Sequence, residues 1–520
     1  MGVLVFFLIS AGLCGNAQAP PESTGGKGSI LLVLPFDNNS GQPSLEWIRE
    51  AAAELLNSRF TSAGFAPLSR ADRLYALDHL GLPQGFQPSR ASSLKLAQTL
   101  DADFIVVGSY RTNGDTIETE AQIVNVPQLR MGTQVTASGP MRDLIAVFDA
   151  LAWKLTRELD PQFDVAEATF VAAGANLNLE AFEQYIRGIT EPDQAERLEH
   201  LDEAVKLSPD FSAAWMALAR EDYAGQQYEQ AAAAFAKVKG NDEDALEAGF
   251  YRGLALMFSG EYAKAETSFA GVARVLPLAP VLSNEGVAIS RQGHDGTALF
   301  RQAVTADPIT PDYHFNLAVS LKRHGDAAEA ETQLGEYLKM RPNDSEAEEM
   351  QAAWKQPSSA SSVDPLERIA RGFDAVAFRQ AAVMLDQVEA SRLAALTADE
   401  RAQTLANQAR EYLSRGLLLE AERLYRQAIA ADEKSEAAHE GLAEVRERAG
   451  DAEGARHEAQ AALGIAPSAE AYLVLARLDL AANRLAEADR DAGEALKLSP
   501  NSQAAKEVLR QVSAKQGAAK

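Results

Sequence analysis

A spacing of 34 residues recurs along this chain and limits its fold more than any other feature of the sequence. Ala231 is followed four residues later by Phe235, and the same pair returns at Ala265 and Phe269. Self-similarity at such a period is typical of solenoids, in which every unit is one supersecondary element. A single unit cannot bury its apolar face alone, whereas a stack of units shares one continuous core.

Prolines mark the ends of these units in the same register. Pro209 and Pro277 lie 68 residues apart, which is two periods, and Pro308 and Pro342 lie 34 residues apart. Proline ends a helix because it lacks an amide proton and its ring clashes with the preceding turn. Only 31 residues separate Pro277 from Pro308, so we expect this unit to be three residues short, in its turn.

The alanine spacing resumes in the last part of the chain, at Ala421, Ala455 and Ala488. Before it, residues 356–364 (QPSSASSVD) are rich in turn-forming residues and predict a linker. Residues 365–399 fit the repeat pattern poorly, and we expect them to form a helical bridge. The repeats therefore fall into two blocks.

Together with Trp215-x-x-Leu218-Ala219, which stands ahead of the first alanine–aromatic pair, these patterns resemble the tetratricopeptide repeat (TPR). The resemblance covers residues 179–355 and 400–512. It implies an all-α TPR solenoid in two blocks, built from helical hairpins. It also implies a concave face, lined by the first helix of each hairpin, on which partners dock.

A different pattern precedes the repeats. Residues 29–36 form a continuous aliphatic run, typical of a strand buried on both faces. Asn113-Gly114 separates two further strand-like runs and predicts a hairpin. The other expected elements are strands at 65–69, 103–111, 116–126 and 131–138 and helices at 46–60, 71–80, 92–100 and 144–159. Residues 29–160 thus predict an α+β amino-terminal domain, a mixed sheet with helices on it, followed by a linker at 161–178.

Two segments of this domain carry a second resemblance. LLVLPFDNNSG at 31–41 and DFIVVGSY at 103–110 are similar to the amino-terminal α/β module of TolB-like envelope proteins. The opening LPF-x-N-x-SG also resembles a module found beside TPR arrays in bacterial regulatory proteins. The resemblance implies an interaction module that faces the bacterial envelope and does not imply a reaction.

The first residues predict export. Residues 2–13 are apolar but too short to cross a bilayer, which needs about 20 residues. Ala17-Gln18-Ala19 then offers a small-residue cleavage site, so residues 1–19 are expected to be a signal peptide and 20–28 a linker. The only cysteine is Cys14, and Leu13 before it argues against a lipoprotein. We expect a periplasmic or secreted protein without a stable membrane span.

Charge and motifs narrow the function. The formal net charge of −25 disfavours nucleic acid as a partner, because phosphate would be repelled. The chain has no Gly-x-Ser-x-Gly elbow and no two histidines at a spacing of four residues, and Gly25–Gly28 precedes a strand rather than a helix. We therefore expect no catalytic site, metal or cofactor, and a partner that is another envelope protein or a peptide segment.

The TPR resemblance points to residues on the concave face. Asn284 and Asn316 occupy matching positions in adjacent units. In peptide-binding TPR proteins an Asn at that position holds the ligand backbone, and nearby basic residues bind its carboxylate. The candidate groove residues are Arg220, Tyr223, Phe250, Tyr251, Met257, Asn284, Arg291, Phe315, Asn316, Lys322 and Arg323. The alternative is that these side chains only pack between repeats.

A second candidate site lies in the amino-terminal domain. The loop Asp37, Asn38, Asn39, Ser40 and Gly41 follows the carboxyl end of a buried strand, where open α/β sheets often bind ligands. In this alternative, the protein is a ligand-sensing regulator and the loop takes a small molecule. The competing interpretation is a turn whose Asp and Asn side chains satisfy their own backbone.

Overall fold

The computed structural model describes residues 28–83, 89–239, 243–355, 365–373 and 375–518. The signal peptide predicted at 1–19 and the linker predicted at 356–364 lie outside the described residues. The chain divides into two compact units, the first holding most residues up to Glu167 and the second holding Ala168–Lys520 together with Ser44–Ala51 and Leu144–Ala146. No helix in these described ranges is long and apolar enough to cross a membrane.

The first unit contains a mixed sheet of seven strands in the order β3-β1-β4-β5-β6, with β2 on β4 and β7 on β5. β1 is parallel to β3 and β4, whereas β5 is antiparallel to β4 and β7. The strands are β1 (Ile30–Val33), β2 (Asp37–Asn38), β3 (Ala66–Pro67), β4 (Phe104–Asn113), β5 (Thr116–Asn125), β6 (Arg130–Met131) and β7 (Val135–Pro140). β6 and β7 both run antiparallel to β5, so the strand expected at 131–138 is present but interrupted at 132–134, where its register on β5 shifts by one residue.

The predicted hairpin is confirmed, with Asn113 paired to Thr116 across a turn in which Gly114 has φ +61°. The continuous run of β1 is buried on both faces, as Leu31, Leu32 and Val33 are all inaccessible to solvent. The helices around the sheet are α1 (Ile48–Ala63), α2 (Arg70–His79), α3 (Arg90–Thr99) and α4 (Leu144–Leu159).

Helices α2, α3 and α4 pack on this sheet through apolar and aromatic side chains. α2 and α3 contribute Ala76 and Leu96 to one apolar cluster with Leu32 and Ile105 of the strands. Phe148 of α4 meets Phe36 with ring centroids 5.7 Å apart. The predicted α+β fold of this domain is thus confirmed. The segment expected as a linker at 161–178 contains a short helix, α5 (Glu167–Ala172), whose Phe170 is fully buried.

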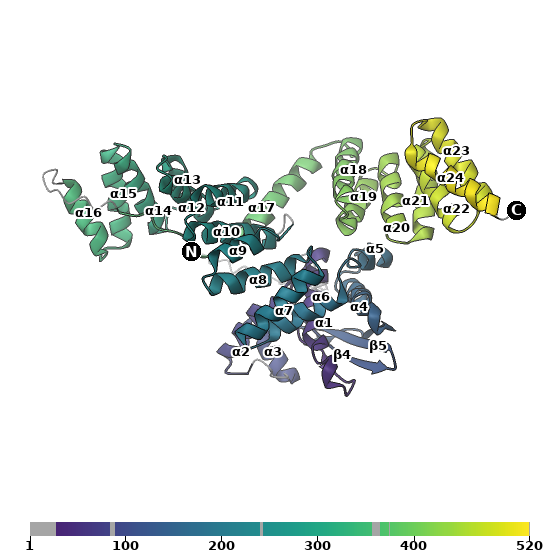
Figure 1. The fold of residues 1–520 in the computed structure, drawn as a ribbon, viewed down its shortest axis with the longest axis horizontal. Coiled ribbons are helices and arrows are strands. Elements are labelled where there is room, and N and C mark those ends of the chain that lie inside the picture. The colour runs from purple at the N-terminus through teal and green to yellow at the C-terminus, as the bar shows by residue number, and fades with distance from the viewer. Residues whose placement is uncertain (1–27, 84–88, 240–242, 356–364, 374, 519–520) are drawn as a thin grey trace, which may run out of the picture. The chain divides into compact units, whose positions relative to one another are not determined.

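The second unit consists of helices in antiparallel pairs, which Figure 1 shows as successive hairpins along the chain. The first block comprises α6 (Leu179–Thr190), α7 (Gln194–Leu207), α8 (Ser212–Ala224), α9 (Tyr228–Phe235), α10 (Glu243–Phe258), α11 (Tyr262–Val275), α12 (Ala279–Arg291), α13 (Thr297–Ala306), α14 (Pro311–Arg323), α15 (Ala327–Met340) and α16 (Ser345–Lys355). The second comprises α18 (Ala398–Ser414), α19 (Leu418–Ala431), α20 (Glu436–Arg448), α21 (Ala452–Ile465), α22 (Ala469–Ala481), α23 (Leu485–Leu498) and α24 (Gln503–Ala518).

Small residues let these helices approach one another. A Cβ atom added to Gly286 of α12 would lie only 2.8 Å from Cε1 of Phe300 of α13. Gly253 of α10 meets Phe269 of α11 in the same way, at 2.6 Å. The aromatic ring fills the space that the missing side chain leaves, as the alanine–aromatic spacing predicts. The prediction that the short unit loses residues in its turn is wrong. Its second helix is shorter instead, since α13 has 10 residues where α11 has 14.

The predicted helical bridge at 365–399 is wrong at its start. Helix α17 begins only at Ala375 and ends at Ala394, and residues 365–373 contain no helix or strand. Pro365 and Gly372 disfavour a helix there. The stronger reason is that side chains of the first repeat block take the hydrogen bonds that a helix would make within itself.

Candidate functional site

Residues 365–373 (PLERIARGF), hereafter the groove segment, lie along α12 and α14 of the first repeat block. Asn284 of α12 donates a hydrogen bond from Nδ2 to the carbonyl of Ala370 at 2.8 Å. The amide of Ala370 donates in return to Oδ1 of Asn284 at 2.9 Å. One carboxamide therefore satisfies both backbone groups of one residue.

Asn316 of α14 makes the same pair of bonds with a residue two positions earlier. Its Nδ2 donates to the carbonyl of Arg368 at 2.8 Å, and the amide of Arg368 donates to its Oδ1 at 2.6 Å. Nδ2 of Asn316 also donates to Ser283 Oγ at 3.1 Å. Asn284 and Asn316 are both fully buried. Because backbone groups two residues apart face the same way in an extended chain, this pairing holds the groove segment extended.

An acidic side chain of the groove segment is buried among basic and hydroxyl groups. Glu367 is 3% exposed. Its Oε1 accepts hydrogen bonds from Ser290 Oγ and Arg323 Nη1, and its Oε2 lies 3.7 Å from Arg291 Nη2. Arg323 Nη2 also donates to the carbonyl of Pro365 at 2.6 Å. A buried carboxylate is tolerated only when paired in this way.

The next side chain, Arg368, enters a site of opposite character. Its Nη2 lies 2.7 Å from Asp344 Oδ2, and its Nη1 lies 3.2 Å from Asp312 Oδ1 and donates to the hydroxyl of Tyr337. The guanidinium also lies over two rings, 4.1 Å from the centroid of Phe315 and 4.8 Å from that of Tyr337. Arginine suits such a site because its flat, permanently charged group stacks and donates at once.

The electrostatics of this second site are mutually reinforcing. Burial opposes ionisation of Arg368, but the hydrogen bonds to Asp344 and Asp312 outweigh it and raise the pKa of the guanidinium. Hydrogen bonds from Tyr337 and Arg368 lower the pKa of Asp344 to about 2. Burial and the bond to Asp344 raise the pKa of Tyr337 to about 12. The three groups therefore keep fixed charges across the physiological pH range.

Apolar contacts complete the docking of the groove segment. Phe373 lies against Phe250 of α10, with ring centroids 5.7 Å apart, and equally close to Phe378 of α17. Ile369 packs against the apolar cluster of the first block, and Phe378 is a buried member of it. Leu366 instead points to solvent and is 62% exposed.

The predicted groove residues divide into two sets. Asn284, Asn316, Arg291, Arg323, Phe250 and Phe315 contact the groove segment. The others have different partners: Lys322 lies over the ring of Trp354, Arg220 pairs with Glu247 at 2.8 Å, and Tyr223, Tyr251 and Met257 pack in the core of the block, to which Ile369 and Phe373 also belong.

Several groove residues escaped the sequence analysis. Ser290, Asp312, Tyr337 and Asp344 bind the groove segment. Asp312 could have been found, since it stands in the first turn of a helix that the repeat register places on the concave face. Asp344 precedes α16 in a loop, and Tyr337 belongs to a second helix, so the register gave no signal for either.

A family model described as tetratricopeptide repeat matches residues 291–345 and 407–470. The chain contains tetratricopeptide repeats. Proteins with TPRs generally mediate protein–protein interactions, and the two matched segments lie one in each block described above. The comparison with curated protein sequences gave no match.

Several solved structures align with parts of the chain at low identity. YrrB, described as a TPR protein with an unusual peptide-binding site, is 15% identical, with 39% of this chain and 99% of YrrB covered and a TM-score of 0.29. MamA from Desulfovibrio magneticus RS-1 is 20% identical, with 32% and 99% covered and a TM-score of 0.29. The LpoB carboxy-terminal domain from Escherichia coli is 21% identical, with 23% and 87% covered and a TM-score of 0.20.

The loop proposed as a small-molecule site behaves as a turn. Asp37 and Asn38 form strand β2 on β4. Asn38 Oδ1 accepts from the amide of Ser40 at 3.0 Å, and Asn38 Nδ2 donates to the carbonyl of Gln42 at 3.1 Å. Gly41 has φ +70°, which closes the turn without strain. Asn38 thus satisfies backbone groups of its own loop, and binding of a small molecule there stays a prediction.

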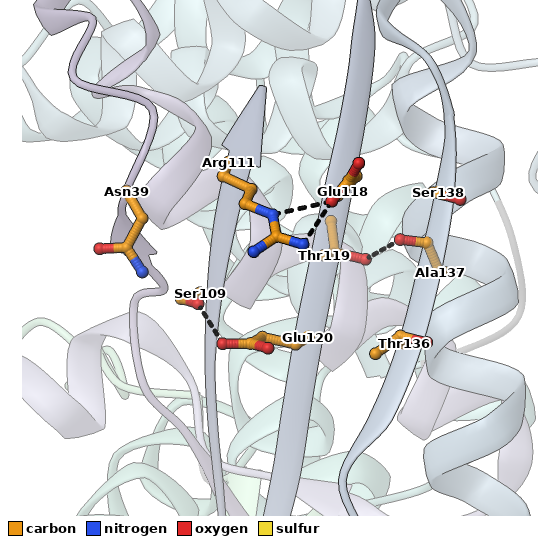
Figure 2. Close-up of a pocket in the computed structure, with 9 residues that line it drawn as sticks. All are labelled: Asn39, Ser109, Arg111, Glu118, Thr119, Glu120, Thr136, Ala137 and Ser138. Carbon is orange, nitrogen blue, oxygen red and sulfur yellow. Dashed lines mark hydrogen bonds and ion pairs between the residues drawn. The ribbon is translucent and has the colours of Figure 1, made fainter. Parts of the chain in front are cut away.

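Asn39 of that loop does line a shallow hollow of about 300 Å³ over the sheet, which Figure 2 shows with β4, β5 and β7. Its charged side chains have hydrogen-bond partners within the sheet. Arg111 bonds to Glu118 at 2.7 Å, and Ser109 donates to Glu120 at 3.0 Å. Within the described residues, no cluster of three or more His, Cys, Asp or Glu side chains could hold a metal ion.

Proposed function

We propose that this protein is a non-enzymatic interaction scaffold whose first TPR block binds an extended peptide segment of a partner protein. One observation carries the proposal, namely the paired hydrogen bonds that Asn284 and Asn316 make to the backbone of an extended segment. A carboxamide carries both a donor group and an acceptor, which match the carbonyl and amide of any residue. These contacts therefore recognise chain conformation before side-chain identity.

The groove also has the means to select side chains. It presents a basic site at Arg291 and Arg323 and an acidic site at Asp312 and Asp344, both partly shielded from solvent. Charge pairs in a shielded site discriminate strongly between partners, because a wrong charge leaves a buried group unpaired. Such a surface suits a protein segment better than a small apolar ligand.

We further propose that the scaffold acts in the bacterial envelope. The apolar run at 2–13 followed by Ala17-Gln18-Ala19 supports export, and the similarity of residues 31–41 and 103–110 to TolB-like modules supports an envelope setting. A net charge of −25 also favours a protein partner over nucleic acid. Mass spectrometry of the chain purified from its own cells should find an amino terminus at Pro20, and an intact Met1 would contradict export by this route.

A displayed library of random peptides tests the proposed function, selected on the full chain with Glu367→Ala/Arg368→Ala so that the groove segment does not hold the site closed. Selected peptides should bind this protein and fail to bind it when Asn284→Ala/Asn316→Ala is added. Lys322→Ala provides the matched control, since this residue lies on the same helix but over Trp354 and away from the segment. If no peptide is selected, or if all three proteins bind the selected peptides equally, the groove does not serve peptide binding.

A further inference from the structure

We infer that the groove selects a peptide in which an acidic residue is followed directly by arginine, and that residues 365–373 of the chain itself compete for the same groove. The inference rests on the proposed function and adds to it the chemistry of the partner and the means by which the site is closed. It is carried by the contacts of two adjacent residues, Glu367 and Arg368.

The acidic position is defined by three groups on two helices. Ser290 and Arg291 end α12, and Arg323 ends α14, and all three meet the carboxylate of Glu367. The carboxylate side chain is 1% exposed, while those of Arg291 and Arg323 are 17% and 26% exposed. A neutral residue here would leave two partly buried guanidinium groups without their anion, and a basic residue would add repulsion.

The arginine position is equally specific. The guanidinium of Arg368 is held between the rings of Phe315 and Tyr337 and two carboxylates, those of Asp312 and Asp344. A lysine would keep the charge but lose the stacking and the divergent donors. An acidic residue would face Asp312, Asp344 and, at 3.5 Å from the guanidinium, Glu346.

The backbone contacts fix the order of the two charges. Asn316 binds both backbone groups of Arg368, so the residue that it holds is the one that enters the acidic site. Successive side chains of an extended chain point to opposite sides, so the preceding residue must enter the basic site. A peptide with arginine before glutamate would place each charge against its own kind in this register.

The groove segment has an advantage over any peptide in solution. It belongs to the same chain, so it binds at a high effective concentration set by its tether. A partner can enter only when the segment has left, and its apparent dissociation constant rises in inverse proportion to the fraction of open grooves. The occupied groove thus sets a threshold for partner binding.

The test measures binding of a labelled peptide, PLERIARGF with blocked ends, to the full chain by fluorescence polarisation. Glu367→Ala/Arg368→Ala is the release variant, since both changes fall on the segment and spare the groove. Leu366→Ala is the matched control, because that side chain is exposed. We expect the peptide to bind the release variant at least about tenfold more tightly than the wild type or the control, as for a groove that is open less than a tenth of the time.

Two further measurements complete the test. A peptide with the charges exchanged, PLREIARGF, should bind the release variant at least about tenfold more weakly than PLERIARGF, the discrimination expected when shielded charge pairs are lost. Adding Asn284→Ala/Asn316→Ala to the release variant should abolish binding. Circular dichroism and thermal melting of each variant establish that it is folded.

The contrary results separate the two proposals. Equal affinity of the wild type and the release variant would overturn competition by the segment, and equal affinity of the two peptides would overturn the charge order. Neither would touch peptide binding as such, which the library selection decides. A wild-type dimer in light scattering that becomes a monomer in the release variant would show the segment in a second copy's groove and would overturn competition within one chain.

Discussion

Arg323 and Glu367 form an ion pair that joins the end of α14 to a segment 44 residues further along the chain. Glu367 has the only side-chain carboxylate of the groove segment, and Ser290 and Arg291 contact it as well. This buried contact joins two parts of the chain that are distant in sequence. Its loss should therefore increase the solvent exposure of the groove segment and leave the helices folded.

The first prediction concerns Glu367→Gln, which removes the charge and keeps the shape. Arg291 and Arg323 then lose their anion, and the segment should leave the groove more often. We expect cleavage by trypsin after Arg368 to be at least about tenfold faster than in the wild type, since cleavage of a transiently open site follows its open population. Peptide mapping over time measures it, and an unchanged rate at Arg368 would show that the ion pair does not hold the segment.

The second prediction concerns Tyr337→Phe, which removes one hydroxyl from the arginine site. Tyr337 Oη donates to Asp344 at 2.6 Å and accepts from Arg368. The loss should lower the free energy of unfolding of the first block by about 1 to 2 kcal/mol. Urea denaturation checks this value. Tyr412→Phe is a suitable control because Tyr412 is 37% exposed in the second block, and a similar loss in both variants would argue against a special role for the hydroxyl.

The third prediction compares two glycines of the first block. Gly286→Ala would place a Cβ atom 2.8 Å from Phe300, and it should destabilise the block by about 1 to 3 kcal/mol through overpacking. Gly335→Ala meets nothing within 4 Å and lies inside α15, so it should be neutral or stabilise by up to about 1 kcal/mol. Thermal melting of the two variants distinguishes them, and the same sign for both would refute the packing argument.

The fourth prediction concerns pH and the amino-terminal unit. Asp149 of α4 is buried 3.2 Å from Arg59 of α1, and burial raises its pKa to about 7 although Arg59 acts in the opposite direction. The folded state therefore binds a proton more tightly than the unfolded state, where the pKa is 3.8. The stability of this unit should fall as the pH rises from about 4 to 7, because deprotonation favours unfolding in that interval.

Asp149→Asn tests this assignment, because the amide cannot ionise. Its stability relative to the wild type should improve by a few kcal/mol between pH 4 and pH 8. The measurement is the pH dependence of thermal unfolding followed at the amino-terminal unit. Parallel curves for the two proteins would mean that Asp149 does not titrate in this interval.

Sequence patterns went furthest where the contacts are local. The positions of Asn284 and Asn316 follow from the repeat register, and both do contact an extended backbone. Lys322 and Arg323 could not be separated in this way, because adjacent residues on a helix point about 100° apart and only the second faces the groove.

The segment that occupies the groove could not be predicted from the sequence, for a different reason. Asn284 and Ala370 are 86 positions apart in the sequence, and no local pattern encodes such a contact. Residues 366–368 and Ala370 are good helix formers, although Pro365 and Gly372 at the two ends are not. The extended form is preferred because the buried carboxamides and charged side chains of the folded block are positioned to bind it.

The spacing of the two asparagines has a consequence for how the array measures its ligand. One step from α12 to α14 advances the groove segment by two residues, and the segment runs against the order of the repeats, from Arg368 at Asn316 to Ala370 at Asn284. The matching position on α10 is Tyr251, which stacks on Phe235 instead of offering an amide. Successive units of the array thus contact the segment backbone at every second residue. A Tyr251→Asn change would be the first step toward a third such contact.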